Sequence, residues 1–88
     1  IAAVTAEADR HIAAEFGRRL ADHRRAAGLT QEALAERAGL HAVTISYLET
    51  GIRAASVPTL VRVADALGVA PGILVDGIPP TDKSTASG

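Results

Sequence analysis

The chain has 88 residues, enough for one domain, and 48% of them are apolar, which excludes a chain too polar to fold. It contains no cysteine, which excludes a disulfide framework, a zinc ribbon and a thiol nucleophile. The formal net charge of −1 is low for a protein whose partner is nucleic acid, although residues 10–53 carry seven basic and five acidic residues and are therefore slightly positive.

The first predicted element is a helix over residues 6–27. Gly28 follows it and is typical of the left-handed residue that ends a helix. Residues that recur every four positions lie along one side of a helix. They are Ile12, Phe16, Leu20 and Arg24.

Two short helices are predicted next, over residues 31–38 and 42–50. Thr30 is a favourable N-cap for the first of them, and Gly39 and Gly51 follow their last residues. Two short helices joined by a turn that contains glycine cross at a steep angle, and the second can enter the major groove of DNA, which is about 12 Å wide.

Two more helices complete the predicted set. One covers residues 57–67 with Ser56 as its N-cap, and a short one begins with Pro71 in the N1 position and runs to Val75.

We therefore expect an all-α fold, a compact five-helix bundle that contains a helix-turn-helix. The domain is expected over residues 1–78, with its core at about residues 10–76. Residues 79–88 are rich in Pro, Ser and Thr, which is typical of a flexible tail or linker.

The predicted helix over residues 42–50 has one side without charge. At about 100° per residue, the opposite side is apolar except for Glu49 and faces the core. A solvated helix face usually carries Lys and Glu, so an uncharged side with hydroxyls and one aromatic ring indicates a contact surface. The alternative is an ordinary exposed face of an alanine-rich protein. The residues of the uncharged side are Ala42, Val43, Ser46, Tyr47 and Thr50.

Three segments carry a resemblance to a known family. They are TQEALAERAGL at residues 30–40, TISYLETG at 44–51 and LVRVADALGV at 60–69. Together they resemble the Cro and phage-repressor type of helix-turn-helix domain, also called the xenobiotic-response-element family. The resemblance covers roughly residues 16–75 and implies a repressor-like DNA-binding domain that regulates transcription, with the helix over residues 42–50 as its recognition helix.

The resemblance also implies which residues contact double-stranded DNA. Gln31 matches a glutamine that binds a phosphate from the start of its helix, where an anion is favoured in any case. Thr50 and Arg53 match positions that meet the DNA backbone. The alternatives are a solvated first helical residue for Gln31 and a solubilising loop charge for Arg53. The positions from which the family touches base edges are here Ala42, Val43, Ser46 and Tyr47.

The start of the recognition helix departs from the family pattern. His41 stands where a Ser or Thr cap is common, and three roles are open to it: a cap through the ring, a phosphate contact when protonated, or exposure to solvent. Ala42 and Val43 have no hydrogen-bonding side chain, but they can contact a thymine methyl group. We expect modest specificity from thymine methyls, from single hydrogen bonds by Ser46 and Tyr47, and from DNA shape.

The resemblance pairs Arg24 with Glu49 as a structural ion pair between the first and third helices. The helical wheel places both residues at core-facing edges. The alternative is two separate surface charges. If the pair is buried, removal of one partner is expected to cost about 3–5 kcal/mol of stability.

Other kinds of chemistry find no support in the sequence. The spacing of His11, His23 and His41 puts no two of them on one helix face, so we expect no metal site. There is no glycine-rich phosphate loop and no triad of nucleophile, histidine and acid, so we expect neither enzyme activity nor a cofactor. No uncharged apolar stretch approaches the roughly 18 residues of a membrane span. We expect a cytoplasmic, bacterial or phage-encoded, nucleoid-associated protein with no membrane partner.

Two functions fit the sequence. The first is a repressor that binds a pseudo-palindromic operator as a homodimer, with half-sites about 34–36 Å apart. The second is a protein-interaction module, such as an antitoxin or a transcription adaptor, with a protein partner and secondary DNA binding. An apolar cluster near the end serves either as the homodimer interface or as the base of the core, and it consists of Ile73, Leu74, Val75 and Ile78.

Overall fold

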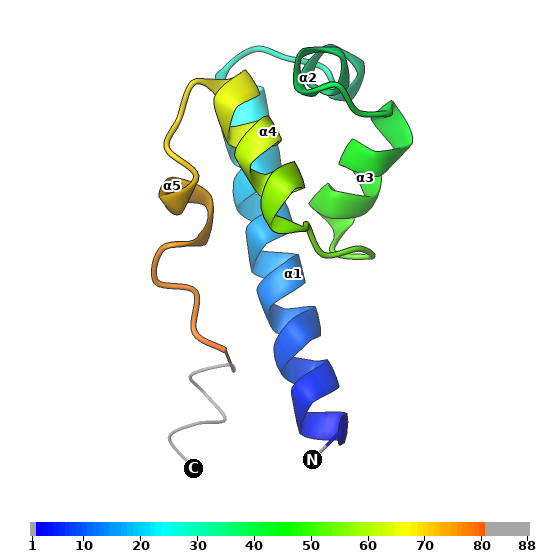
Figure 1. The fold of residues 1–88 in the computed structure, drawn as a ribbon, viewed down its shortest axis with the longest axis vertical. Helices are drawn as coiled ribbons and strands as arrows, with labels where there is room; N and C mark the ends of the chain where they lie inside the picture. Colours follow the sequence, from blue (N-terminus) through cyan, green and yellow to red (C-terminus); the bar gives the residue numbers. More distant parts are fainter. Residues whose placement is uncertain (1, 81–88) are drawn as a thin grey trace.

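The structure, a computed structural model, describes residues 2–80, and their backbone forms five helices without any strand. Figure 1 shows α1 running the length of the molecule, with the other helices packed around its C-terminal half. The expected all-α five-helix fold is confirmed. All but the first two residues of the expected tail over residues 79–88 lie outside the described part. The helices are α1 (Ala2–Ala26), α2 (Gln31–Ala38), α3 (Ala42–Thr50), α4 (Val57–Leu67) and α5 (Gly72–Val75).

Local hydrogen bonds explain where the middle helices begin and end. The hydroxyl oxygen of Thr30 accepts from the backbone N–H of Ala33 at 3.0 Å, which caps α2. The hydroxyl of Ser56 caps α4 in the same way. Gly39 ends α2 with a φ of 70°, a left-handed conformation in which a residue with a Cβ atom is strained. These caps lie where the sequence predicted them.

Both ends of α1 and the start of α5 differ from the prediction. The helix α1 begins at Ala2 instead of residue 6, because residues 2–5 contain no glycine or proline that would interrupt it. It ends at Ala26, one residue early. Pro71 occupies the N-cap of α5, so the short helix begins one residue later than predicted.

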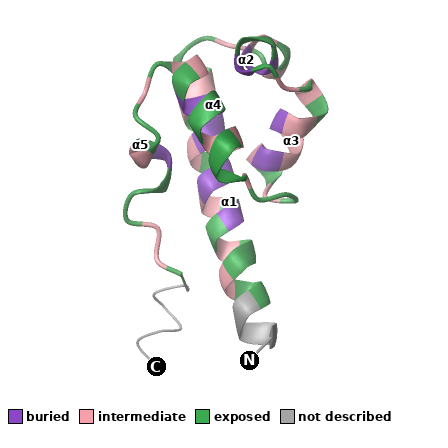
Figure 2. Cartoon of the chain, viewed as in Figure 1, coloured by how far each residue is buried: buried purple, intermediate pink, exposed green. Residues whose placement is uncertain are grey.

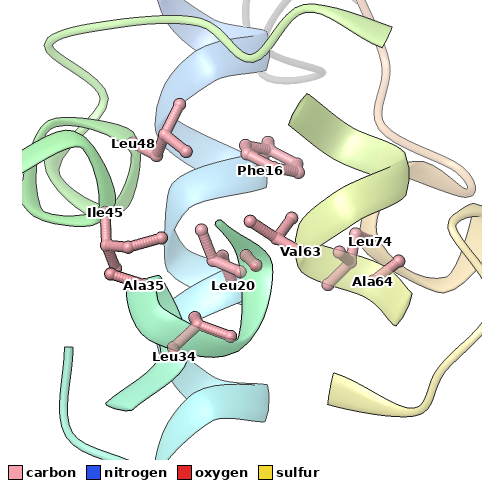
Figure 3. Packing of buried hydrophobic residues seen from close by; sticks show 10 residues of the cluster. Phe16, Leu20, Leu34, Ala35, Ile45, Leu48, Val63, Ala64 and Leu74 are labelled. Atoms are coloured by element: carbon pink, nitrogen blue, oxygen red, sulfur yellow. The ribbon is translucent and has the colours of Figure 1, made fainter. Parts of the chain in front are cut away.

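All five helices contribute to one hydrophobic core, which Figure 3 shows from close by. The helix α1 packs against α3 and α5, and α2 packs against α3 and α4. Since each helix buries one apolar stripe here, the core fixes the angle between α2 and α3. The side chains with no more than 1% of their surface exposed are Leu20, Leu34, Ile45, Leu48, Val63, Ala64 and Leu74.

A glycine in the middle of α1 allows α3 to approach its backbone. A Cβ atom at Gly17 would lie 2.2 Å from the carbonyl oxygen of Leu48 and 2.7 Å from that of Glu49. A second close approach joins the same two helices, because a Cβ atom at Gly51 would lie 3.0 Å from the Cα atom of Ala14. The depth at which α3 sits against α1 therefore depends on glycine at position 17.

The N-terminal part of α1 extends beyond the core. Among residues 6–12, where burial is described, Figure 2 shows no buried residue, and the first buried side chain along this part of α1 is Ala13. At the other side of the molecule, Arg19 donates a hydrogen bond of 2.6 Å to the backbone carbonyl of Asp76, which ties the end of α5 to α1. No helix in the described part is long and apolar enough to cross a bilayer.

Candidate nucleic-acid interface

The outer side of α3 carries most of the uncharged residues that the sequence placed there. Val43 has 54% of its surface exposed, Thr50 is exposed, and Ser46 and Tyr47 are half-buried. The placement of Ala42 on this outer side is corrected by the structure, because its side chain packs partly against the core. A wheel gives only the direction around the helix axis, whereas the burial of a side chain also depends on the helices packed against α3, which are α1 and α2.

An ion pair whose two side chains are largely buried lies beneath the outer side of α3. The Nε atom of Arg24 donates to Oε2 of Glu49 at 2.6 Å, and its Nη2 atom donates to Oε1 at 3.0 Å. Only 12% of the Arg24 side chain and 5% of the Glu49 side chain are exposed. The hydrogen bonds from Arg24 to Glu49 raise the pKa of Arg24 above its ordinary value. Arg24 also donates to the carbonyl of Leu29 at 2.8 Å, so it links α1, α3 and the loop before α2.

The same carboxylate holds the first residue of α2. The Nε2 atom of Gln31 donates to Oε1 of Glu49 at 3.0 Å, a contact that the sequence did not reveal. An amide nitrogen carries two N–H groups, so one donor of Gln31 is used by Glu49 and the second is available to a phosphate. The position at the N-terminus of α2 also favours an anion. Glu49 therefore orients the amide that the resemblance assigns to DNA.

Thr50 and His41 are less suited to the roles considered for them. The hydroxyl of Thr50 donates to the carbonyl of Ser46 at 2.9 Å, which occupies its single donor within α3. A phosphate contact from Thr50 requires this hydroxyl to rotate. The side chain of His41 is exposed and makes no capping hydrogen bond to α3, so the structure excludes the ring cap. The phosphate contact of His41 stays a prediction.

Arg53 lies beside Tyr47 at the C-terminal end of α3. Its Cζ atom is 5.3 Å from the centroid of the Tyr47 ring, within the range of a cation–π interaction. Its backbone N–H donates to the carbonyl of Tyr47 at 3.3 Å. The sequence did not predict this contact, because Gly51 reverses the chain between the two residues and helical spacing says nothing about a residue beyond the helix end.

The charges around this surface nearly cancel. Arg24 and Glu49 neutralise each other, and Glu32 is exposed next to Gln31 in the first turn of α2. Arg53 is exposed, and no ion pair involves it within residues 2–80. The surface therefore offers a few directed donors instead of a strongly positive field, which agrees with the low net charge of the chain.

A helix-turn-helix family model matches residues 15–76, which is most of the chain and includes every helix except the N-terminal part of α1. The chain belongs to the helix-turn-helix family. The resemblance to the Cro and phage-repressor type that the sequence indicated is thereby confirmed. No curated protein sequence matches the chain significantly.

Two solved structures support the assignment to the helix-turn-helix family. The restriction-modification controller protein C.AhdI from Aeromonas hydrophila is 38% identical in sequence, with a TM-score of 0.68 over 69% of this chain and 92% of that one. The clp gene regulator ClgR from C. glutamicum is 28% identical, with a TM-score of 0.69 over 72% of this chain and 82% of that one. In the present helix-turn-helix, α2 and α3 are the two helices of the motif, and Gly39 and Leu40 lie in the turn between them.

Proposed function

We propose that this protein is a transcription regulator that binds double-stranded DNA by placing α3 in the major groove. One observation carries the proposal: the outer side of α3 lies between two hydrogen-bond donors whose side chains are held in place by neighbouring residues. The amide of Gln31 is held by Glu49, and the guanidinium of Arg53 is held over the ring of Tyr47. Phosphate contacts from such donors would fix the register of the recognition helix on the duplex. The helix-turn-helix family match and the two regulators of similar structure support this function.

Sequence preference is expected to come from the middle of α3. Val43 is well exposed and suited to contact a thymine methyl group, while Ala42 contributes less because it is partly buried. Ser46 and Tyr47 can each offer one hydroxyl to a base edge. This helix has no Arg, Gln or Asn for a bidentate base contact, so its specificity ratio is expected to be modest.

The proposed regulator acts as a homodimer on a pseudo-palindromic operator, as a repressor in the bacterial or phage-infected cytoplasm. The apolar cluster near the end of the chain has a buried part and an exposed part. Leu74 is buried and Ile78 packs on the core, whereas Ile73 and Val75 are 46% and 37% exposed. Val75 also lines an open apolar pocket together with Ile12. This apolar surface of α5 and α1 supports pairing of two copies, because one small domain offers too little area for tight specific binding.

A salt titration tests the proposed function. Binding of a fluorescent random-sequence duplex is measured at several salt concentrations for the wild type, Arg53→Ala and Arg62→Ala. Arg62 is an exposed arginine of α4 and serves as the matched control. We expect a steep loss of affinity with salt, a slope about one unit smaller for Arg53→Ala, and a wild-type slope for Arg62→Ala.

The interaction module is the second candidate, and the net charge of −1 favours it. In that case a protein partner would cover the uncharged side of α3, and DNA binding would be secondary. Duplex binding that is weak and indifferent to salt, by a folded protein, would overturn the regulator and favour the protein partner.

A further inference from the structure

We propose that Tyr47 is a positioning residue for DNA binding, because the face of its ring holds the guanidinium of Arg53 where it can donate to a DNA phosphate. This inference rests on the proposed function and extends it, since Tyr47 would otherwise act only through a hydroxyl on a base edge. The hydroxyl and the ring face are separate parts of the side chain, so one residue can serve both roles.

Two contacts hold Arg53 at Tyr47. The left-handed conformation of Gly51, with a φ of 77°, turns the chain back over the last turn of α3. The backbone N–H of Arg53 then donates to the carbonyl of Tyr47 at 3.3 Å, and its guanidinium lies 5.3 Å from the ring centroid. Tyr47 thus holds both the backbone and the side chain of Arg53, although Arg53 belongs to a loop.

Stacking on a ring leaves the guanidinium free to bind an anion. A guanidinium that interacts with an aromatic ring through its face keeps the N–H donors at its edge available for an anion. Within residues 2–80, no carboxylate forms a salt bridge with Arg53. The charge is therefore oriented without being neutralised, which distinguishes Arg53 from the paired Arg24.

The contact with the ring reduces the conformational entropy that the Arg53 side chain loses when it binds DNA. A long arginine side chain in a loop normally populates many rotamers and loses that freedom when it contacts a phosphate. A ring that already selects the orientation reduces this loss. From the usual strength of an exposed cation–π contact, we expect the ring to improve DNA affinity by about two- to fivefold.

A double-mutant cycle separates the ring from the hydroxyl. Tyr47→Phe keeps the ring and removes the hydroxyl, whereas Tyr47→Leu removes both, and each is combined with wild-type Arg53 or with Arg53→Ala. The dissociation constant is measured for a random-sequence duplex at low salt, where phosphate contacts dominate. We expect Tyr47→Leu to bind about two- to fivefold more weakly than Tyr47→Phe when Arg53 is present, and equally when it is absent.

The outcomes distinguish this inference from the proposed function. A ratio between Tyr47→Leu and Tyr47→Phe that is the same in both backgrounds would overturn the positioning role of Tyr47 and leave the regulator standing. A folded wild type that binds no duplex would overturn both.

A measurement on the free protein keeps the test independent of DNA affinity and of folding. Protons above an aromatic ring are shielded, so the Cδ proton signals of Arg53 are expected upfield in the wild type and in Tyr47→Phe. They are expected at ordinary positions in Tyr47→Leu, while the core signals of all three proteins agree. Ordinary Arg53 shifts in the wild type would contradict the stacking itself.

Discussion

Glu49 connects three helices beneath the candidate interface. Its carboxylate accepts hydrogen bonds from Arg24 of α1 and from Gln31 of α2, while its own backbone belongs to α3. Both partners offer further donors after these bonds are made. Glu49 therefore joins the stability of the domain to the orientation of a proposed DNA contact.

Replacing Glu49 is expected to destabilise the protein strongly. Glu49→Ala leaves the nearly buried cation of Arg24 without its carboxylate, which should cost about 3–5 kcal/mol in the free energy of unfolding measured by urea denaturation. The control Glu36→Ala removes an exposed carboxylate of α2 and should change stability by less than about 0.5 kcal/mol. A nearly unchanged stability of Glu49→Ala would contradict the structural role of the pair.

Glu15 is expected to make the stability of the folded protein decrease at low pH. Hydrogen bonds from Arg18 and Arg19 lower the pKa of Glu15 to about 2. Since this pKa lies below the value in the unfolded chain, the stabilisation is complete above about pH 4.5 and is lost as the pH falls towards 2.

The contribution of Glu15 is expected to be about 1 kcal/mol, because the side chains are partly exposed and solvent screens the charges. Urea denaturation of Glu15→Gln at pH 7 and pH 3 should show a smaller acid-induced loss than the wild type. Glu36→Gln is the matched control and should retain the wild-type dependence. Equal losses in the wild type and Glu15→Gln would rule out this effect.

Contacts between residues were predictable from the sequence where the family pattern pairs the two positions. Contacts that depend on how helices and loops pack were not predictable. The pairing of Arg24 with Glu49 was expected from the resemblance, and the structure has it at 2.6 Å. The contacts of Gln31 with Glu49 and of Tyr47 with Arg53 were missed. Both join residues from different elements, and their distance depends on how helices and loops are packed, which a linear pattern does not contain.

At the scale of elements, the packing of α1 on α3 determines how far the recognition helix projects. Gly17 is the point of closest approach, where even a methyl group would collide with the backbone of α3. In an isolated helix, alanine is preferred over glycine by roughly 1 kcal/mol, so helix propensity alone predicts that Gly17→Ala stabilises the protein.

We expect Gly17→Ala to lower the stability of the protein instead of raising it. Gly17→Ala should destabilise the domain by about 1–3 kcal/mol, because α1 and α3 must separate to admit the methyl group. The control Gly72→Ala adds a methyl group in α5, 3.5 Å from the nearest side-chain atom, and should be tolerated. Thermal melting of both variants checks the prediction, and a Gly17→Ala protein as stable as the wild type would contradict the close approach.

Helix boundaries were predictable where a side chain or a glycine marks them. Thr30, Ser56 and Gly39 act locally, through bonds to neighbouring residues, so sequence suffices to place them. The start of α1 lacks such a mark in the described residues and was misplaced by four residues. The partial burial of Ala42 against the core was missed, because burial at a helix crossing depends on a second helix.

At the scale of the whole molecule, the proposed homodimer supplies the second half of the DNA contact. A two-fold interface brings the same patch of two copies together, so one substitution acts on both sides of it. Ile73→Asp should convert the dimer to a monomer in sedimentation experiments and leave the monomer folded, since this side chain is about half exposed.

The matched control for the dimer is Val57→Asp, on an exposed apolar residue at the start of α4. It should leave the association unchanged. A wild type that stays monomeric at the concentration where it saturates its operator would contradict the dimer, as would an Ile73→Asp protein that associates normally.

The central claim is that α3 and its two flanking donors bind duplex DNA with sequence preference. Selection from a random-sequence duplex pool at near-physiological salt tests it most directly, with the double variant Gln31→Ala, Arg53→Ala as the control. We predict that the wild type enriches a two-fold symmetric site with thymines opposite Val43, and that the folded double variant does not. The claim would be contradicted if the folded wild type enriched no site, or if the double variant enriched the same site equally well.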